Sequence, residues 1–141
     1  MPLATFLIDS LLIAVAVLMH YEMLHVLTIW IPKLAIRHRY RIVIGVFGSL
    51  FAHVCEIALF AFGYFMLVHH GDSGAFGGNF DGSFADCLYF SITSYTSLGF
   101  GDIEPFGALR LLSGFEALTG LVLITWTASF MFVEMRRFWE G

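Results

Sequence analysis

The sequence has 141 residues, a length that suits a single domain. It is 59% hydrophobic and only 13% charged, with a mean hydropathy of +0.84, whereas soluble domains contain about 45–50% apolar and about 25% charged residues. This composition excludes an ordinary water-soluble domain and predicts a protein that resides in lipid. The few basic residues do not form a surface for binding nucleic acid.

Three apolar stretches are long enough to cross a bilayer, which takes about 20 helical residues. They cover residues 6–31, 42–68 and 111–135. The short basic segment Pro32–Arg41 is expected in the cytoplasm, because positively charged loops remain on that side. The sequence thus predicts a multi-pass membrane protein with its N-terminus outside and its C-terminus in the cytoplasm. The small size favours a prokaryotic inner membrane.

A shorter apolar segment, residues 84–95, lies between the second and third stretches. Ser83 precedes it and Asp86 follows three positions later, a pattern that begins helices. Twelve residues at about 1.5 Å each reach about 18 Å, or half of a membrane. The preceding segment His69–Gly82 is rich in glycine and polar residues, which predicts an exposed loop. A half-length helix followed by glycine-rich chain indicates a re-entrant loop, since non-helical backbone at that depth must line water or be buried in protein.

The run after this short helix reads Thr96-Ser97-Leu98-Gly99-Phe100-Gly101-Asp102. It resembles the T-x-G-[YF]-G-D filter of the potassium-channel superfamily, and the resemblance extends over residues 84–135. It implies a pore helix at 84–95, a selectivity filter at 97–101 and an inner helix at 111–135. Backbone carbonyls of the filter would replace the water around K⁺. The implied K⁺ ligands are Ser97, Leu98, Gly99 and Phe100, with Gly101 completing the filter.

The two filter glycines suit this chemistry. Successive carbonyls can point at one axis only if the backbone alternates between unusual dihedral angles, and Gly99 and Gly101 adopt positive φ at little cost. The side chains of Leu98 and Phe100 would then point away from the axis and pack behind the filter. Many family members have threonine, valine and tyrosine where this chain has Ser97, Leu98 and Phe100, so the degree of selectivity for K⁺ over Na⁺ stays open.

The resemblance also implies roles for residues around the filter. Asp102 would bond to the pore helix from behind the filter, and Tyr89 stands where the family often has a tryptophan partner for that aspartate. Glu104 would help to make the outer mouth acidic. The remaining implied assignments are support of the filter by Thr93 and Thr96, a gating hinge at Gly120, and an inner cavity lined or approached by Val122, Leu123 and Trp126.

Two positions of the inner helix allow more than one interpretation. Glu116 could face permeant ions in the cavity, but a hydrogen bond to a neighbouring pore helix is favoured. Gly120, like Gly114, could be a close-packing position rather than a hinge.

Ionisable residues within the first two stretches are a further unusual feature, because such groups are costly in a membrane and often functional. Glu22 and His25 are three residues apart and share a helix face, as do His53 and Glu56. We expect a polar clamp in which these two pairs join the first helix to the second. Proton sensing by the histidines and a metal site are alternatives, although His20 and His25 lie far apart around a helix.

The sequence as a whole therefore predicts an all-α membrane protein with three transmembrane helices, a re-entrant pore helix and a selectivity filter. One pore loop cannot surround an ion, so a homotetramer is expected. The expected function is passive K⁺ permeation, without enzymatic activity and without a cofactor. The alternatives are a weakly selective cation channel of the same fold, and a membrane sensor or scaffold that does not conduct.

Overall fold

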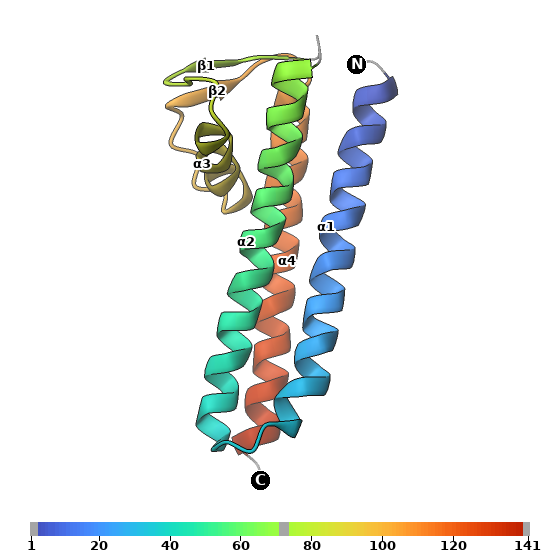
Figure 1. The fold of residues 1–141 in the computed structure, drawn as a ribbon, viewed down its shortest axis with the longest axis vertical. Coiled ribbons are helices and arrows are strands. Elements are labelled where there is room, and N and C mark those ends of the chain that lie inside the picture. Colours follow the sequence, from blue (N-terminus) through green and yellow to red (C-terminus); the bar gives the residue numbers. More distant parts are fainter. Residues whose placement is uncertain (1–2, 71–73, 140–141) are drawn as a thin grey trace.

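The computed structural model describes residues 3–70 and 74–139 and is mostly helical. Its elements, in chain order, are α1 (Leu3–Trp30), the 3₁₀ turn η1 (Ile31–Lys33), α2 (His38–His70), β1 (Phe76–Gly78), α3 (Phe84–Tyr95), β2 (Ile103–Pro105) and α4 (Leu109–Trp139). Figure 1 shows α1, α2 and α4 as three long helices running side by side, with α3 and the two strands gathered beside one end of α2.

The three long helices carry the membrane-spanning sequence. In the part of the chain that the structure describes, the helices long and apolar enough to cross a bilayer are Thr5–Lys33, Arg39–His70 and Leu109–Arg137. Large apolar side chains project outward from them, among them Leu11, Phe47, Leu118 and Phe132. Exposed apolar faces of this length suit lipid or other subunits rather than water. The chain is therefore a membrane protein with three candidate spans.

A short connection reverses the chain between α1 and α2. Pro32 lies in the first turn of η1, where its missing N–H costs no helical hydrogen bond. The guanidinium of Arg41 then donates to the carbonyl of Leu34 at 2.8 Å. This bond ties the start of α2 to the connection, so that α1 and α2 run antiparallel as neighbours.

The helix α3 covers the range that the sequence indicates for the short helix. Ser83 is its N-cap, and the Ser83 hydroxyl accepts from the Asp86 N–H at 3.1 Å. The Asp86 carboxylate accepts from the N–H of Asp81 at 2.8 Å, instead of from Ser83 as in a complete capping box. One face of α3 is buried against α2 and α4, through Cys87, Phe90, Ser91 and Tyr95.

The loop predicted over His69–Gly82 is only partly a loop. Strand β1 pairs antiparallel with β2, with Phe76 opposite Pro105 and Gly78 opposite Ile103. The prediction of an exposed loop was wrong for Phe76–Gly78. A strand of three residues whose partner is distant in the sequence leaves no local pattern from which to predict it. Residues 71–73 of the predicted loop lie outside the described residues.

This small sheet fixes how the chain leaves the 97–101 segment. Gly78 has φ of +77°, and a Cβ built there would lie 2.3 Å from the backbone oxygen of Asp102. Asp102 directly follows 97–101, so the close approach of Gly78 holds that end of the segment in place. Asn79 adds a backbone hydrogen bond from its N–H to the same oxygen, at 2.8 Å.

We predict that Gly78→Ala lowers stability more than Gly82→Ala does. Both glycines have positive φ, which costs a non-glycine residue about 1 kcal/mol, but a Cβ at Gly82 would meet nothing within 4 Å. Thermal unfolding in detergent micelles should therefore show the larger fall in midpoint for Gly78→Ala. Equal midpoints for the two variants would show that contact with Asp102 does not constrain the sheet.

Candidate functional site

The C-terminal end of α3 lies at mid-height of the long helices. Its last residue, Tyr95, contacts His53 and Glu56 through its hydroxyl group, and both partners stand near the middle of α2. The segment after α3 therefore begins deep within the membrane-spanning part of the molecule and returns to β2 near its end (Figure 1).

Backbone angles alternate along the segment that resembles a filter. Ser97, Gly99 and Gly101 have φ of 58°, 54° and 79°, so every second residue has positive φ. Glycine at two of these positions matches the expectation from sequence. Ser97 was not anticipated; it is the only non-glycine residue with positive φ among the residues that the structure describes. Such a conformation in a non-glycine residue is costly and marks functional sites more often than ordinary loops.

The two side chains expected behind the filter are both largely exposed in the single chain, Leu98 at 57% and Phe100 at 65%. The ring of Phe100 lies nearly parallel to that of Tyr89 on α3, with centroids 6.5 Å apart and planes inclined by 7°. Their packing behind a filter stays a prediction. The N–H groups of Leu98 and Gly99 both donate to the Thr93 carbonyl, at 2.9 and 3.0 Å, which anchors the start of the segment to α3. Thr96 caps the helix end.

Asp102 faces α3 through Tyr89. Both residues line a cavity of about 340 Å³ together with Asn79, Asp86 and Ile103. Partial desolvation raises the pKa of the Tyr89 hydroxyl, and the neighbouring Asp102 carboxylate raises it further. The structure therefore places Asp102 near a tyrosine of α3, while the hydrogen bond that the resemblance implies stays a prediction.

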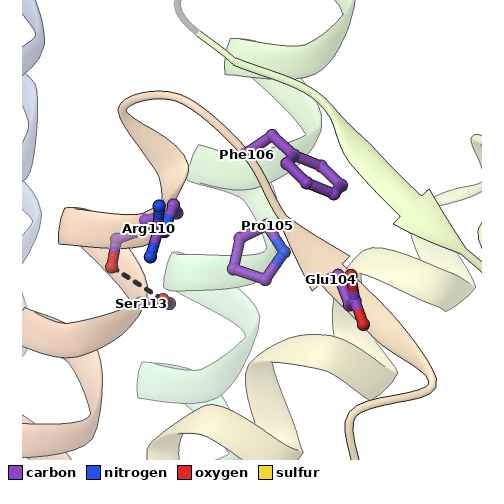
Figure 2. Close-up of a pocket in the computed structure, with 5 residues that line it drawn as sticks. All are labelled: Glu104, Pro105, Phe106, Arg110 and Ser113. Carbon is purple, nitrogen blue, oxygen red and sulfur yellow. Dashed lines mark hydrogen bonds between the residues drawn. The ribbon is translucent and has the colours of Figure 1, made fainter.

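Glu104 lies on β2 at the same end of the molecule, where it is exposed to solvent. It lines a pocket of about 440 Å³ with Pro105, Phe106, Arg110 and Ser113. Figure 2 shows Glu104 and Arg110 on opposite sides of Pro105. A basic residue thus shares the pocket with the acid, so the negative potential expected from Glu104 is partly offset.

Glu116 is buried and bonded within its own chain. Its carboxylate accepts from the Ser91 hydroxyl of α3 and from the Tyr64 hydroxyl of α2, each at 2.5 Å. Of the two interpretations of Glu116, the hydrogen bond to a pore-type helix fits these contacts, and a role facing permeant ions does not. The carboxylate joins α2, α3 and α4 at one point.

Gly120 is a close-packing position. A Cβ at Gly120 would lie 2.1 Å from the backbone oxygen of Tyr95, whereas one at Gly114 would meet nothing within 4 Å. Helix α4 continues through Gly120 without interruption. The absent side chain therefore lets α4 touch the end of α3, and of the two glycines only Gly120 has this role.

The side chains expected at the inner cavity lie on different sides of α4. Val122 is exposed, but Leu123 is only 1% exposed within its own chain. The ring of Trp126 lies 5.4 Å from His20 and 6.4 Å from Tyr21, both on α1. Leu123 is thus packed within its own chain and the ring of Trp126 lies toward α1, while the place of these residues around a cavity between subunits stays a prediction.

The polar clamp between α1 and α2 exists, but with a different residue of α1. Nδ1 of His20 lies 2.9 Å from Glu56 Oε1, and both side chains are fully buried. Glu22 and His25 are exposed, so their pairing with α2 was wrong. At about 100° per residue they lie on the opposite side of α1 from His20. Ala16, Leu24 and Leu27 are buried on the same face of α1 as His20. The spacing of three or four residues between successive members of this set was the sequence signal that could have shown the inward face.

Comparison with known proteins agrees with this geometry. A family model described as ion channel matches residues 52–137, more than half of the chain. The chain belongs to the ion channel family. The matched range includes α3, the 97–101 segment and nearly all of α4, while α1 lies outside it. An ion channel rather than an enzyme is the function class that this assignment supports.

One relative shares part of the ion channel sequence. The potassium channel protein kcv of Paramecium bursaria Chlorella virus 1 is 36% identical over 56 residues. The alignment covers 35% of this chain and 60% of the viral protein, so this ion channel spans about three fifths of that relative. No solved structure matches.

For the close contact of α4 with α3, Gly120→Ala should destabilise the ion channel by about 1–3 kcal/mol, the usual cost of overpacking. Gly114→Ala, with open space around its Cβ, should change the free energy of unfolding by less than about 0.5 kcal/mol. Equilibrium unfolding in mixed micelles measures both. A loss for Gly114→Ala as large as that for Gly120→Ala would contradict the packing role.

For the buried carboxyl group, Glu116→Gln should cost about 1–3 kcal/mol, because the two hydroxyl donors that share Glu116 lose one of its acceptor oxygens and meet an amide that is partly a donor. The matched control is Glu22→Gln, the same chemical change at an exposed position of α1. If both variants unfold at the same denaturant concentration, Glu116 does not hold α3 to its neighbours.

Proposed function

We propose that four copies of this chain form a K⁺ channel, with the 97–101 segments of all four lining one central filter. K⁺ would move passively down its gradient, with no cofactor. In this arrangement α3 is the re-entrant pore helix, α2 the outer helix and α4 the inner helix. The N-terminus would lie outside and the C-terminus in the cytoplasm of a prokaryotic inner membrane, in keeping with the basic connection between α1 and α2.

The observation that carries the proposal is the alternation of positive φ at Ser97, Gly99 and Gly101 at the end of a helix that stops at mid-height. This backbone can present successive carbonyls to one side, which is what a dehydrated K⁺ requires. Residues 97–102 are all exposed in the single chain. Polar backbone exposed at membrane depth is tolerated only around water or within protein, so other subunits must complete its surroundings.

The exposed apolar side chains support the same assembly. Leu98 is 57% exposed, although a leucine beside an ion path needs apolar contacts to stay fixed. Leu121, Val122 and Ile124 of α4 are exposed as well. A four-fold arrangement of α4 helices would bury such residues between subunits or place them around a cavity below the filter.

A second candidate is a tetrameric channel that discriminates weakly between K⁺ and Na⁺. It is favoured by two properties of the filter segment itself. Serine at position 97 keeps the hydroxyl but lacks the methyl group that would restrict χ1. Phe100 has no hydroxyl with which to brace the filter, and its contact with Tyr89 is ring stacking alone.

Ion flux from proteoliposomes distinguishes these functions. We expect K⁺ efflux down an imposed gradient, at least tenfold slower flux in matched Na⁺ vesicles, and block by external Ba²⁺. Gly99→Ala should abolish the flux, because alanine is strained at φ of +54°, while Gly114→Ala should preserve it. Equal K⁺ and Na⁺ fluxes would establish the weakly selective channel, and flux that survives Gly99→Ala would contradict conduction through the 97–101 segment.

A further inference from the structure

A cluster of five polar side chains joins all four helices at mid-height. The proposed conduction of ions through the 97–101 segment does not use these side chains. His20 comes from α1, His53 and Glu56 from α2, Tyr95 from the end of α3 and Thr127 from α4. His20 and Glu56 are fully buried, and the His53 side chain is 13% exposed. Buried ionisable groups at this depth are costly, so a cluster of them indicates a function.

The nitrogen and oxygen atoms of this cluster that could bind a metal ion lie close together around the Glu56 carboxylate. Nδ1 of His20 is 2.9 Å from Glu56 Oε1, and Nδ1 of His53 is 3.1 Å from Glu56 Oε2. The hydroxyl of Tyr95 is 2.8 Å from the same His53 nitrogen and also bonds to Glu56 Oε2. The candidate ligand atoms of the two histidines and Glu56 all lie within 4.8 Å of one another. Ligands about 2.0–2.1 Å from a tetrahedral Zn²⁺ are roughly 3.3 Å apart, so small movements would suffice.

The Nε2 atoms of both rings lie near a single hydroxyl group. Nε2 of His53 lies 3.0 Å, and Nε2 of His20 3.4 Å, from Oγ1 of Thr127. A histidine that binds a metal through Nδ1 carries its proton on Nε2 and donates it to a neighbouring oxygen. The Thr127 oxygen has two lone pairs and can accept from both rings. The ring orientations therefore already suit two metal-binding histidines.

We propose that His20, His53, Glu56 and Tyr95 bind a divalent transition ion of the Zn²⁺ class. Two imidazoles with oxygen ligands suit Zn²⁺ and its neighbours in the first transition row. The charge of the ion would be balanced by the Glu56 carboxylate and an ionised Tyr95, which leaves the buried site neutral. On binding, Tyr95 releases its proton to the solvent, one per ion bound, and each imidazole moves its proton from Nδ1 to Nε2.

A mostly apolar cavity adjoins this site. His53, Tyr95 and Thr127 line a cavity of about 480 Å³ that also reaches Thr96, just before the filter segment. A bound ion would connect α1 and α2 to the last residue of α3, two positions before Ser97. The site would thus fix the helix end from which the filter segment begins.

Titration of the purified full-length protein with Co²⁺ tests the site, since tetrahedral Co²⁺ absorbs strongly in the visible range and Zn²⁺ then displaces it. We expect one Co²⁺ per chain in the wild type and in His25→Gln, the matched control on the outward face of α1. His20→Gln and Glu56→Gln should lose the tetrahedral spectrum and bind at least tenfold more weakly. Thr127→Val, which keeps every ligand, should bind about tenfold more weakly.

Three results would overturn the site. They are no tetrahedral spectrum in the wild type, equal loss for His25→Gln and His20→Gln, and unchanged affinity in Thr127→Val. Should His20→Gln or Glu56→Gln fail to assemble by size-exclusion chromatography, the Thr127→Val titration decides the question. Binding is measured here without ion flux, so its result does not depend on whether the protein conducts K⁺.

Discussion

Two buried carboxylates hold the short helix α3 in place, and the rest of the molecule depends on that placement. Glu116 accepts from Ser91 of α3 and from Tyr64 of α2, and Glu56 accepts from the Tyr95 hydroxyl at the end of α3. A buried donor left without its hydrogen-bond partner is costly. Sliding or rotating α3 would break several such bonds at once, so its end stays at mid-height.

The fixed position of α3 determines the path of the 97–101 segment. The chain must turn at Tyr95 and return toward β2 within this segment, where Ser97, Gly99 and Gly101 take positive φ. The pairing of β1 with β2 and the close approach of Gly78 to Asp102 hold the far end. The segment is therefore held at both ends while residues 97–101 themselves stay exposed in the single chain.

The extra helix α1 is more than an attachment to an ion channel unit. Its His20 bonds to Glu56 of α2, and Trp126 of α4 packs against the same ring. Through Glu56 and Tyr95, α1 is one hydrogen-bonded step from the residues that precede the filter segment. A change at α1, whether in packing, protonation or a bound ion, would be transmitted to α3 through contacts that are already in place.

The sequence by itself determined the three spans, the capped half-length helix, the glycine positions of the 97–101 segment and the family resemblance, because length, apolar runs and glycine's backbone freedom are local properties. It also indicated that Glu116 bonds to a pore-type helix. Only the tertiary structure decided that His20 rather than Glu22 and His25 meets Glu56, that Trp126 faces α1, and that β1 pairs with β2. These outcomes depend on helix phase and on contacts between distant segments, where a rotation of about 100° per residue moves a side chain from the core to the surface.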